Sequence, residues 1–245
     1  MTDTTDILRG LRELGLGPGT VVLVHSSLRS LGGLGAQELW HALREAVGDE
    51  GTVLVPTLSY ERVTAANPIF DVRTTPSCVG AFPEWVRKQP GVIRSVHPTH
   101  SVAGDGYCAA ELLREHVHDR TPAGPGSPFR RLRNAGGFIL MLGCGLAPNT
   151  SMHGVEELTE PPYLFTHETR FTCIDAAGER FSAVYRCHGH FPQHYERVEE
   201  LLTGDELRRG RVGEADAYLI SAPALWKKAS LALESNPYFF TEPRE

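Results

Sequence analysis

The sequence predicts an α/β fold, with a mixed central sheet flanked by helices and a C-terminal α+β portion made of a hairpin and helices. Apolar runs such as TVVLVHSS are continuous, which is typical of strands buried on both faces. Segments with helical spacing alternate with these runs up to about residue 165, and an alternating pattern with a Gly-containing turn follows. We expect a single domain over 1–245, with 1–165 as the α/β core and 166–245 as the hairpin and helix portion.

The first half of the core reads as two helix–strand pairs. Asp3 to Leu14 has apolar residues at helical spacing, and GLGPG separates it from the strand TVVLVHSS. The helix AQELWHALREAVG, which we expect to stop at Gly48, leads to the strand GTVLVPTLSY, and this β-α-β order predicts a right-handed connection. Residues 61–78 are polar and aperiodic, and a loop of this length indicates a functional role.

The second half of the core continues with the helix VGAFPEWVRKQ, the strand GVIRSV and the helix DGYCAAELLREHV. The loop DRTPAGPGSPF leads to a short helix, FRRLRNA, and the strand GGFILMLGCG leads to a helix that begins at NTSMHGVEE. After this core, RFTCIDAAGERFSAVYR reads as a hairpin, and we expect helices at about 192–209 and 222–234.

Charge and cysteine content limit the classes of function. The net charge of the 245 residues is -6 and no Lys/Arg run occurs, so we expect no nucleic-acid partner. No apolar stretch has the length of a membrane span and the N-terminus lacks the pattern of a signal peptide, so we expect no membrane partner. Five cysteines lie far apart without a C-x-x-C pair, which indicates a reducing compartment. We therefore expect a cytoplasmic protein.

Three polar segments follow predicted strands, where ligands gather in open α/β sheets. They are HSSLRS, HPTHS and NTSMHGVEE. In the first, the hydroxyls of Ser26 and Ser27 stand beside free backbone N–H groups, and Arg29 adds a cation, which suits a phosphate. A helix-capping serine with a solvated arginine is the alternative interpretation.

The second segment, HPTHS, is stiffened by its proline and presents His97 and His100 either to a pocket or to the backbone at the edge of the core. Two histidines without a third ligand at a fixed spacing are a weak zinc signal. The later stretch CHGHFPQHYERVEE offers Cys187, His188, His190 and His194, but their spacing matches no common zinc finger or ribbon. Residues that face a ligand, or a solvated loop, are the other interpretations of that stretch.

The third segment places His153 within the first turns of a helix, after the capping candidates Asn149, Thr150 and Ser151. The helix start disfavours a charged imidazolium, whereas a glutamate three residues later shares the face of His153 and accepts its other ring N–H. An uncharged histidine that is oriented by an acid is what a general base requires. An exposed His/Glu turn is the alternative.

Together these segments resemble the aminoglycoside 3-N-acetyltransferase family, which is distinct from the superfamily of general N-acetyltransferases. The matching stretches are VVLVHSSLRSLG, GTVLVPTLSY, Phe70–Asp71, RSVHPTHSVAGDG, GPGSPFRRL and MLGCGLAPNTSMHGVEEL, in the family's order over most of residues 8 to 165. The resemblance implies that acetyl-coenzyme A donates an acetyl group to an amine of an aminoglycoside or related small molecule, with antibiotic resistance as the consequence. We expect no metal in this reaction, and a monomer or homodimer.

The resemblance also implies site residues by position. The implied cofactor-binding residues are Ser26, Ser27, Leu28, Arg29, Ser30, Thr99, His100, Ser101, Ser127 and Phe129. The family's NTS-x-H-x-x-E pattern falls on His153 and Glu156 as the catalytic pair, which leaves Glu157 as a spectator.

Acyl transfer to an amine requires a base, because a protonated amine is no nucleophile, and His153 held by Glu156 is the expected base. Donors to the oxyanion are expected around Thr99 to Ser101. Asp71 in the long loop is the candidate for binding a cationic amine. Cys144 is not expected to act as a nucleophile, because it lies deep in a predicted strand.

Other functions stay open at this point. Glu61 and Asp71 are the only acidic residues of the 61–78 loop, so a biosynthetic amine or another non-aminoglycoside acceptor is an alternative. A metal-dependent hydrolase that uses His97, His100 and the later histidines is an alternative from another class, and stoichiometric zinc needed for activity would favour it. A catalytically idle coenzyme-binding protein would tolerate the loss of His153.

Overall fold

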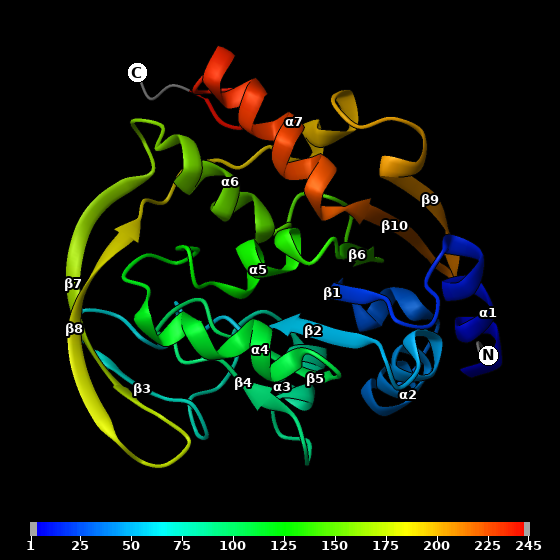
Figure 1. Cartoon of the computed structure of the whole chain (residues 1–245), viewed down its shortest axis with the longest axis horizontal. Coiled ribbons are helices and arrows are strands. Elements are labelled where there is room, and N and C mark those ends of the chain that lie inside the picture. The colour runs from blue at the N-terminus through cyan, green and yellow to red at the C-terminus, as the bar shows by residue number, and fades with distance from the viewer. Residues whose placement is uncertain (1–3, 243–245) are drawn as a thin grey trace.

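Residues 4–242 are described by this structure, a computed structural model, and within them the strands form a seven-stranded and a three-stranded sheet (Figure 1). The strands are β1 (Val21–Ser26), β2 (Thr52–Pro56), β3 (Ile69–Asp71), β4 (Ile93–Arg94), β5 (Val102–Gly106), β6 (Phe138–Leu142), β7 (Phe165–Ile174), β8 (Arg180–His188), β9 (Leu207–Val212) and β10 (Ala215–Ser221). The seven-stranded sheet has the order β4-β5-β2-β1-β6-β10-β9 and the smaller one the order β3-β7-β8.

The helices largely follow the predicted pattern. They are α1 (Thr4–Leu14), α2 (Ala36–Val47), α3 (Ala81–Val86), α4 (Ala109–Arg114), α5 (Pro128–Asn134), α6 (Ser151–Thr159) and α7 (Ala222–Ser235), with short 3-10 helices at Leu28–Leu31, Glu115–His118, Tyr195–Glu200 and Gly204–Glu206. α2 stops at Gly48 as predicted, and Asp3, the predicted start of the first helix, lies outside the described residues. No helix within 4–242 is long and apolar enough to cross a membrane.

Strand direction brings four strand ends to one edge of the main sheet. β1 pairs in parallel with both β2 and β6. β5 runs antiparallel to β2, and β4 runs antiparallel to β5, so β4 has the same direction as β2. The carboxyl ends of β1, β2, β4 and β6 therefore lie at the same edge, which is where a ligand site is expected in such sheets.

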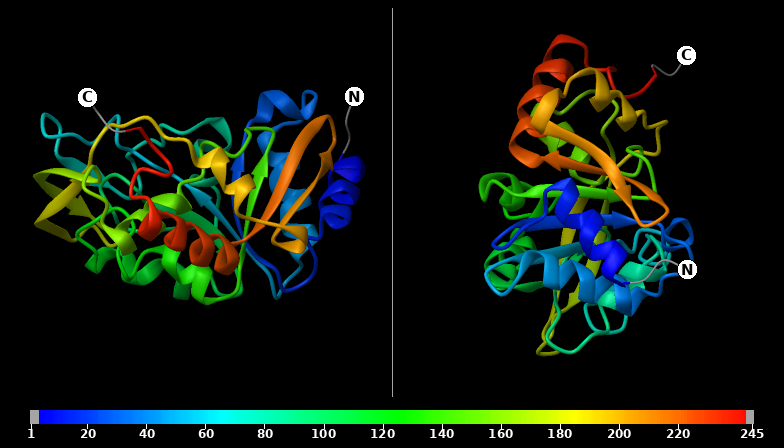
Figure 2. Two further views of the ribbon diagram at one scale, coloured as in Figure 1. Left: turned by 90° about the horizontal axis from the view of Figure 1, so that it is seen from above. Right: turned by 90° about the vertical axis from the view of Figure 1, so that its right-hand side faces the viewer.

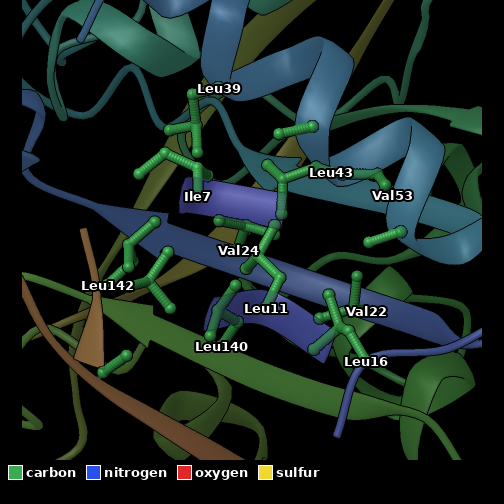
Figure 3. Close-up of a cluster of buried hydrophobic side chains, with 14 of the residues drawn as sticks. Ile7, Leu11, Leu16, Val22, Val24, Leu39, Leu43, Val53, Leu140 and Leu142 are labelled. Atoms are coloured by element: carbon green, nitrogen blue, oxygen red, sulfur yellow. The ribbon is translucent and has the colours of Figure 1, made fainter. Parts of the chain in front are cut away.

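The main sheet is covered by helices on both faces, as the continuous apolar runs predict. Val22 and Val24 pack with α1, α2 and α3, and the cluster around them is shown in Figure 3. Leu23, between them in β1, packs on the opposite side with α4, α5, α6 and α7. Figure 2 shows α2 on one side of the sheet and α5 and α7 on the other. The predicted mixed α/β fold is thus confirmed.

The second sheet contains the predicted hairpin and one strand that was not predicted. β7 and β8 pair antiparallel along their length and form the tall curved ribbon of Figure 1. β3 lies within 61–78 and pairs in parallel with β7, so the interpretation of that whole range as a loop is wrong. The reason is a buried apolar side chain in a short segment: Phe70 packs with Phe171 and Tyr185.

Two further parts of the prediction are wrong. The range 192–209 is not a helix, because it holds two short 3-10 helices and then β9, which pairs with β10. Gly204 at φ 56 interrupts the amphipathic pattern, and β10 joins β6, so the C-terminal portion completes the main sheet. The predicted strand GVIRSV shrinks to two residues, and VAGDG forms β5 instead. Gly104 fits there because an added Cβ would collide with Leu54 of β2.

Candidate active site

A pocket with a volume of about 680 Å³ lies at the edge where the parallel strands end. Residues of all three polar segments line it: Ser26 after β1, Thr99 and His100 after β4, and His153 from α6. The β7–β8 hairpin contributes His188 to the same pocket. The three segments therefore line one pocket, and the second sheet supplies part of its lining.

α6 positions His153 beside Glu156. The side-chain oxygen of Asn149 accepts a hydrogen bond of 3.1 Å from the backbone N–H of Ser151, so the start of the helix is fixed. Nδ1 of His153 lies 3.2 Å from Oε2 of Glu156, which is fully buried. The spacing of three residues puts both side chains on one face of the helix. Nε2 of His153 is left for the pocket.

Two tyrosines that the sequence did not reveal hold Glu156. The hydroxyl of Tyr195 donates to Oε2 over 2.8 Å, and the hydroxyl of Tyr163 donates to Oε1 over 3.0 Å. Burial, and then the charge of Glu156, raise the pKa of both phenols, so both stay protonated donors. A carboxylate with three donors has its orientation fixed. Tyr195 is 42 positions from His153, and no motif or periodicity connects the two.

Glu157, the expected spectator of catalysis, is buried and hydrogen-bonded. Its Oε2 accepts from the hydroxyl of Thr121 over 2.6 Å, and its Oε1 accepts from the backbone N–H of Ala123 over 2.8 Å. Oε1 also lies 2.8 Å from Nε2 of His188. Adjacent glutamates on α6 therefore orient one histidine each, and both histidines line the pocket.

The turn after β4 is shaped by a buried histidine. Nδ1 of His97 accepts the backbone N–H groups of Thr99 and His100 over 3.3 and 3.0 Å. The ring of His97 stacks on His116 at a centroid distance of 4.7 Å and lies outside the pocket lining. Burial holds the pKa of His97 and of His100 well below the ordinary value, so both rings are neutral. Of the two alternatives for HPTHS, His97 faces the backbone and His100 faces the pocket.

The HSSLRS segment forms a 3-10 turn after β1. Ser26 lines the pocket, and its buried hydroxyl has no hydrogen-bond partner within the described part of the chain. Ser30 donates to the carbonyl of Gly143 over 2.9 Å and lies 3.2 Å from the hydroxyl of Ser27. Arg29 is exposed, and Leu28 packs at the margin of the core.

His25 is a pocket residue that the sequence analysis did not single out, although it directly precedes the two serines. Its Nε2 is buried without a hydrogen-bond partner within residues 4–242. Burial lowers the pKa of His25 to about 3, so this ring too is neutral.

Several residues implied by the resemblance do not line the pocket. Ser101 is buried, and its hydroxyl donates to the carbonyl of Thr57 and accepts a hydrogen bond from Nε–H of Arg94. Ser127 is buried and caps α5 through its hydroxyl, and Phe129 is a core residue. The assignment of Ser101, Ser127 and Phe129 to the coenzyme site stays a prediction.

Asp71, the residue expected to bind an amine, lies at the end of β3 and does not line the pocket. Its Oδ1 accepts the backbone N–H of Arg73 over 2.8 Å. The hydrogen bonds and the charge of Arg73 outweigh the effect of burial and lower the pKa of Asp71.

Cys144 is not as deep as the sequence suggests. It follows β6 and lines the pocket, so the argument from depth against its acting as a nucleophile is wrong. Burial nevertheless raises the pKa of Cys144 to about 11, which leaves little of the reactive thiolate near neutral pH.

The histidine-rich stretch after β8 does not gather into one cluster. Among residues 4–242, the side chains placed to hold a metal ion together are His100, His153 and His188. Of the four residues Cys187, His188, His190 and His194, only His188 belongs to this group. His194 instead lies 3.3 Å from Glu196.

Comparisons with known proteins identify the family. The profile of a family described as aminoglycoside 3-N-acetyltransferase matches residues 23–234. Aminoglycoside N(3)-acetyltransferase VII of Streptomyces paromomycinus is 30% identical, over 95% of this chain and 94% of that protein. Aminoglycoside N(3)-acetyltransferase IV of Salmonella sp is 31% identical, over 98% of this chain and 90% of that protein.

Solved structures give the same result. A crystal structure of aminoglycoside acetyltransferase AAC(3)-IVa in complex with a gentamicin is similar with a TM-score of 0.86 at 29% identity, covering 98% of this chain and 92% of that one. A binary complex of AAC-IIIb with CoASH is similar with a TM-score of 0.84 at 28% identity, covering 100% and 99%. The profile match over most of the chain, and relatives of this similarity over nearly their whole length, show that the chain belongs to the aminoglycoside 3-N-acetyltransferase family.

Proposed function

We propose that this protein is an acetyl-coenzyme A-dependent N-acetyltransferase that acts on an amine of an aminoglycoside or a related small molecule and so contributes to antibiotic resistance. The observation that carries the proposal is the His153–Glu156 contact of 3.2 Å at a pocket where the parallel strands end. Relatives named as aminoglycoside N(3)-acetyltransferases, and a related structure that holds CoASH, support the same reaction.

His153 serves as the general base. Its Nε2 takes a proton from the acceptor nitrogen as that nitrogen attacks the thioester carbonyl carbon. Glu156 accepts a hydrogen bond from Nδ1–H of His153 and stabilises the imidazolium that forms, while Tyr163 and Tyr195 hold the carboxylate in place. As the carbon–sulfur bond breaks, His153 returns the proton to the leaving thiolate. The products are an amide and a free thiol, so no covalent acyl-enzyme is needed.

The oxyanion of the addition step requires donors that are not already in use. The backbone N–H groups of Thr99 and His100 are directed to His97, and the hydroxyl of Ser101 is engaged inside the protein. The pocket lining also carries the hydroxyls of Ser26 and Thr99. The side-chain hydroxyl of Ser26 has no hydrogen-bond partner within residues 4–242, so it is free to donate. The hydroxyl oxygen of Thr99 accepts a hydrogen bond of 2.8 Å from Nδ1–H of His100, so the hydroxyl proton of Thr99 is also free to be donated. We assign these two hydroxyls to the oxyanion and to the thioester.

The coenzyme site extends from these hydroxyls along the turn after β1. We assign phosphate binding to the exposed guanidinium of Arg29, which is carried by the turn that also contains Ser27, Leu28 and Ser30. Ser127 and Phe129 contribute by holding the start of α5.

One observation favours a second candidate for the acceptor. No Asp or Glu lines the pocket within the described residues, whereas a polycationic aminoglycoside gains affinity from carboxylates. Asp71 lies outside the lining. An amine with fewer positive charges, such as a biosynthetic intermediate, is therefore the alternative acceptor. We further propose a cytoplasmic protein, monomeric or homodimeric, without nucleic-acid or membrane partners.

Thiol release from acetyl-coenzyme A, measured against a panel of aminoglycosides and of simple mono- and diamines, tests the proposal. Amine-dependent release is expected, and it should fall by about 100-fold or more in His153→Gln while coenzyme A affinity is retained. His118→Gln, an exposed histidine outside the pocket, is the matched control. Full turnover in the His153→Gln variant would contradict the assignment of His153 as the general base. Activity that needs stoichiometric zinc would favour the hydrolase instead.

A further inference from the structure

Three imidazoles from three segments converge on one side of the pocket. The ring centroids of His100 and His153 are 5.5 Å apart, those of His153 and His188 are 4.9 Å apart, and those of His100 and His188 are 5.9 Å apart. Each histidine offers one ring nitrogen, and these three nitrogens all lie within 4.8 Å of one another. Three histidines on one Zn²⁺, with Zn–N bonds of about 2.1 Å, place their centroids roughly 5 Å apart. The rings already have the spacing of a zinc ligand set.

Two of the rings are oriented by carboxylates, as zinc-binding histidines commonly are. Glu156 lies 3.2 Å from Nδ1 of His153, and Glu157 lies 2.8 Å from Nε2 of His188. The other nitrogen of each ring is thereby left as a lone-pair donor. Nδ1 of His188 is buried and has no hydrogen-bond partner within residues 4–242.

The third ring is prepared in the same way by a hydroxyl. Nδ1 of His100 lies 2.8 Å from Oγ1 of Thr99, so Nε2 is its free nitrogen. Burial lowers the pKa of His100 and of His188, and the neutral imidazole is the form that binds a metal. Hard ions such as Mg²⁺ or Ca²⁺ need oxygen ligands, and no carboxylate lines this pocket within the described residues.

We propose that His100, His153 and His188 bind one Zn²⁺ ion, with a water or a small ligand from the pocket as the fourth ligand. Three imidazole ligands are typical of a zinc site. The same ligands also bind Co²⁺, Ni²⁺ or Cu²⁺ when these ions are added in the laboratory. The two adjacent glutamates of α6 complete the site as partners of its ligands. The acetyl transfer proposed above uses no metal, and this site shares His153 with it.

The site has one consequence that rests on the proposed function. The lone pair on Nε2 of His153 cannot both bind zinc and take a proton from an amine. Bound Zn²⁺ therefore inhibits acetyl transfer, and a chelator restores it. The ion acts as a reversible inhibitor rather than as a cofactor.

Metal binding is tested directly on the full chain, without any assay of activity. Metal-free wild-type protein titrated with CoCl₂ should develop the intense visible absorption of a four-coordinate Co²⁺ site at one equivalent, and ZnCl₂ should abolish this absorption. Zinc should also remain bound at one equivalent after gel filtration. A wild-type spectrum like that of the free aquo ion, or no retained zinc, would overturn the proposal whatever the variants do.

Variants then identify the ligands. His188→Ala should weaken Zn²⁺ binding by more than about 100-fold, and Glu157→Gln, which keeps the shape of the side chain, by about 10- to 100-fold. His167→Ala is the matched control, because His167 lines the same pocket but is not one of the three. Circular dichroism shows whether each variant is folded. Undiminished binding in folded His188→Ala, or loss of binding in His167→Ala, would show that the ion binds elsewhere.

The inhibitory consequence has its own readout. The ratio of rates with and without one equivalent of Zn²⁺ should be far below one in wild type and should return toward one in His188→Ala. If wild type binds zinc but shows no acetyl transfer with any amine, the proposed function fails and the metal site stands. If transfer occurs and no metal binds, the metal site fails and the proposed function stands.

Discussion

The hydroxyl of Tyr195 donates to Oε2 of Glu156 over 2.8 Å, and so connects the 3-10 helix at Tyr195–Glu200 to the acid on α6. The same phenol lies 3.2 Å from Nδ1 of His153, so one tyrosine contacts both members of the pair. Its ring is buried and packs edge-on against Phe240 at a centroid distance of 6.2 Å. The orientation of the base therefore depends on a segment that no catalytic motif includes.

Removing this phenol tests whether it positions the pair. Tyr195→Phe deletes one hydrogen bond to a carboxylate, an interaction of about 1.5–3 kcal/mol, so kcat should fall by roughly 10- to 100-fold. KM for both substrates should change little, since the ring and its packing remain. Steady-state kinetics with acetyl-coenzyme A and the best amine measure this. Tyr107→Phe, on an exposed ring, is the control, and an unchanged kcat in Tyr195→Phe would assign the phenol a purely structural role.

The exposed Arg29 should recognise a phosphate of coenzyme A. Arg29→Ala is expected to weaken coenzyme A binding by about tenfold, the size of one charge-assisted contact at the surface. Dephospho-coenzyme A, which lacks the 3′-phosphate, should bind wild type and variant alike. Isothermal titration calorimetry of wild type and Arg29→Ala, each with coenzyme A and with dephospho-coenzyme A, measures the coupling between Arg29 and the 3′-phosphate. Equal loss for both ligands in the variant would mean that Arg29 contacts another part of the molecule.

The buried carboxyl of Asp119 should make stability depend on pH. Burial is the main cause that raises its pKa from 3.8 to about 6, and its Oδ2 has no hydrogen-bond partner within the described chain. Between these two pH values the folded state binds a proton that the unfolded state has released. The free energy of unfolding therefore falls as pH rises through this window. Above pH 6 the Asp119 carboxylate is charged in the folded state, and the full destabilisation that results from its burial is present.

Asp119→Asn removes this cost, while its amide oxygen still accepts the backbone N–H of Gly126, a bond of 3.0 Å in the wild type. Above the window the variant should be more stable than wild type by about 1–2 kcal/mol, less than the full shift because solvent screens the group. Below it the difference should vanish. Urea unfolding across the window checks this, and a difference that is constant with pH would contradict it.

Gly154 should tolerate no side chain. A Cβ at this position would collide with the indole of Trp226, because α6 and α7 pack closely there. Gly154→Ala is expected to lower the free energy of unfolding by about 1–3 kcal/mol through overpacking, despite the better helix propensity of alanine. Thermal or urea unfolding measures the loss. Gly17→Ala, where an added Cβ meets nothing within 4 Å, is the matched control and should be near neutral.

The sequence predicts those parts of the site that follow strands of the main sheet. Ser26, His100 and His153 each come shortly after a continuous apolar run, and parallel direction brings such segments to one edge. The His153–Glu156 contact follows from helical spacing alone, since both lie on one helix. These inferences use local patterns, which is why they could be made without coordinates.

The parts that could not be predicted depend on long-range pairing. His188 reaches the pocket because the β7–β8 hairpin forms a separate sheet with β3, and no local pattern specifies that pairing. Tyr195 reaches it from the 3-10 helix that follows β8 in the chain. The predicted helix at about 192–209 includes the first residues of β9. The two buried residues of this strand, Leu207 and Val212, are separated by arginines and a glycine, which leaves little strand alternation. The hydrogen bonds from the backbone N–H groups of Thr99 and His100 to Nδ1 of His97 could not be predicted either, because they depend on the exact shape of the turn.

The late position of Tyr195 in the chain bears on how the enzyme is made. A nascent polypeptide that has emerged only through β8 already carries His153 and Glu156, yet it lacks the phenol that fixes their orientation. It also lacks β10, the strand that covers the edge of β6. We therefore expect incomplete chains still on the ribosome to be inactive, so that a truncated translation product neither consumes thioester nor protects the cell.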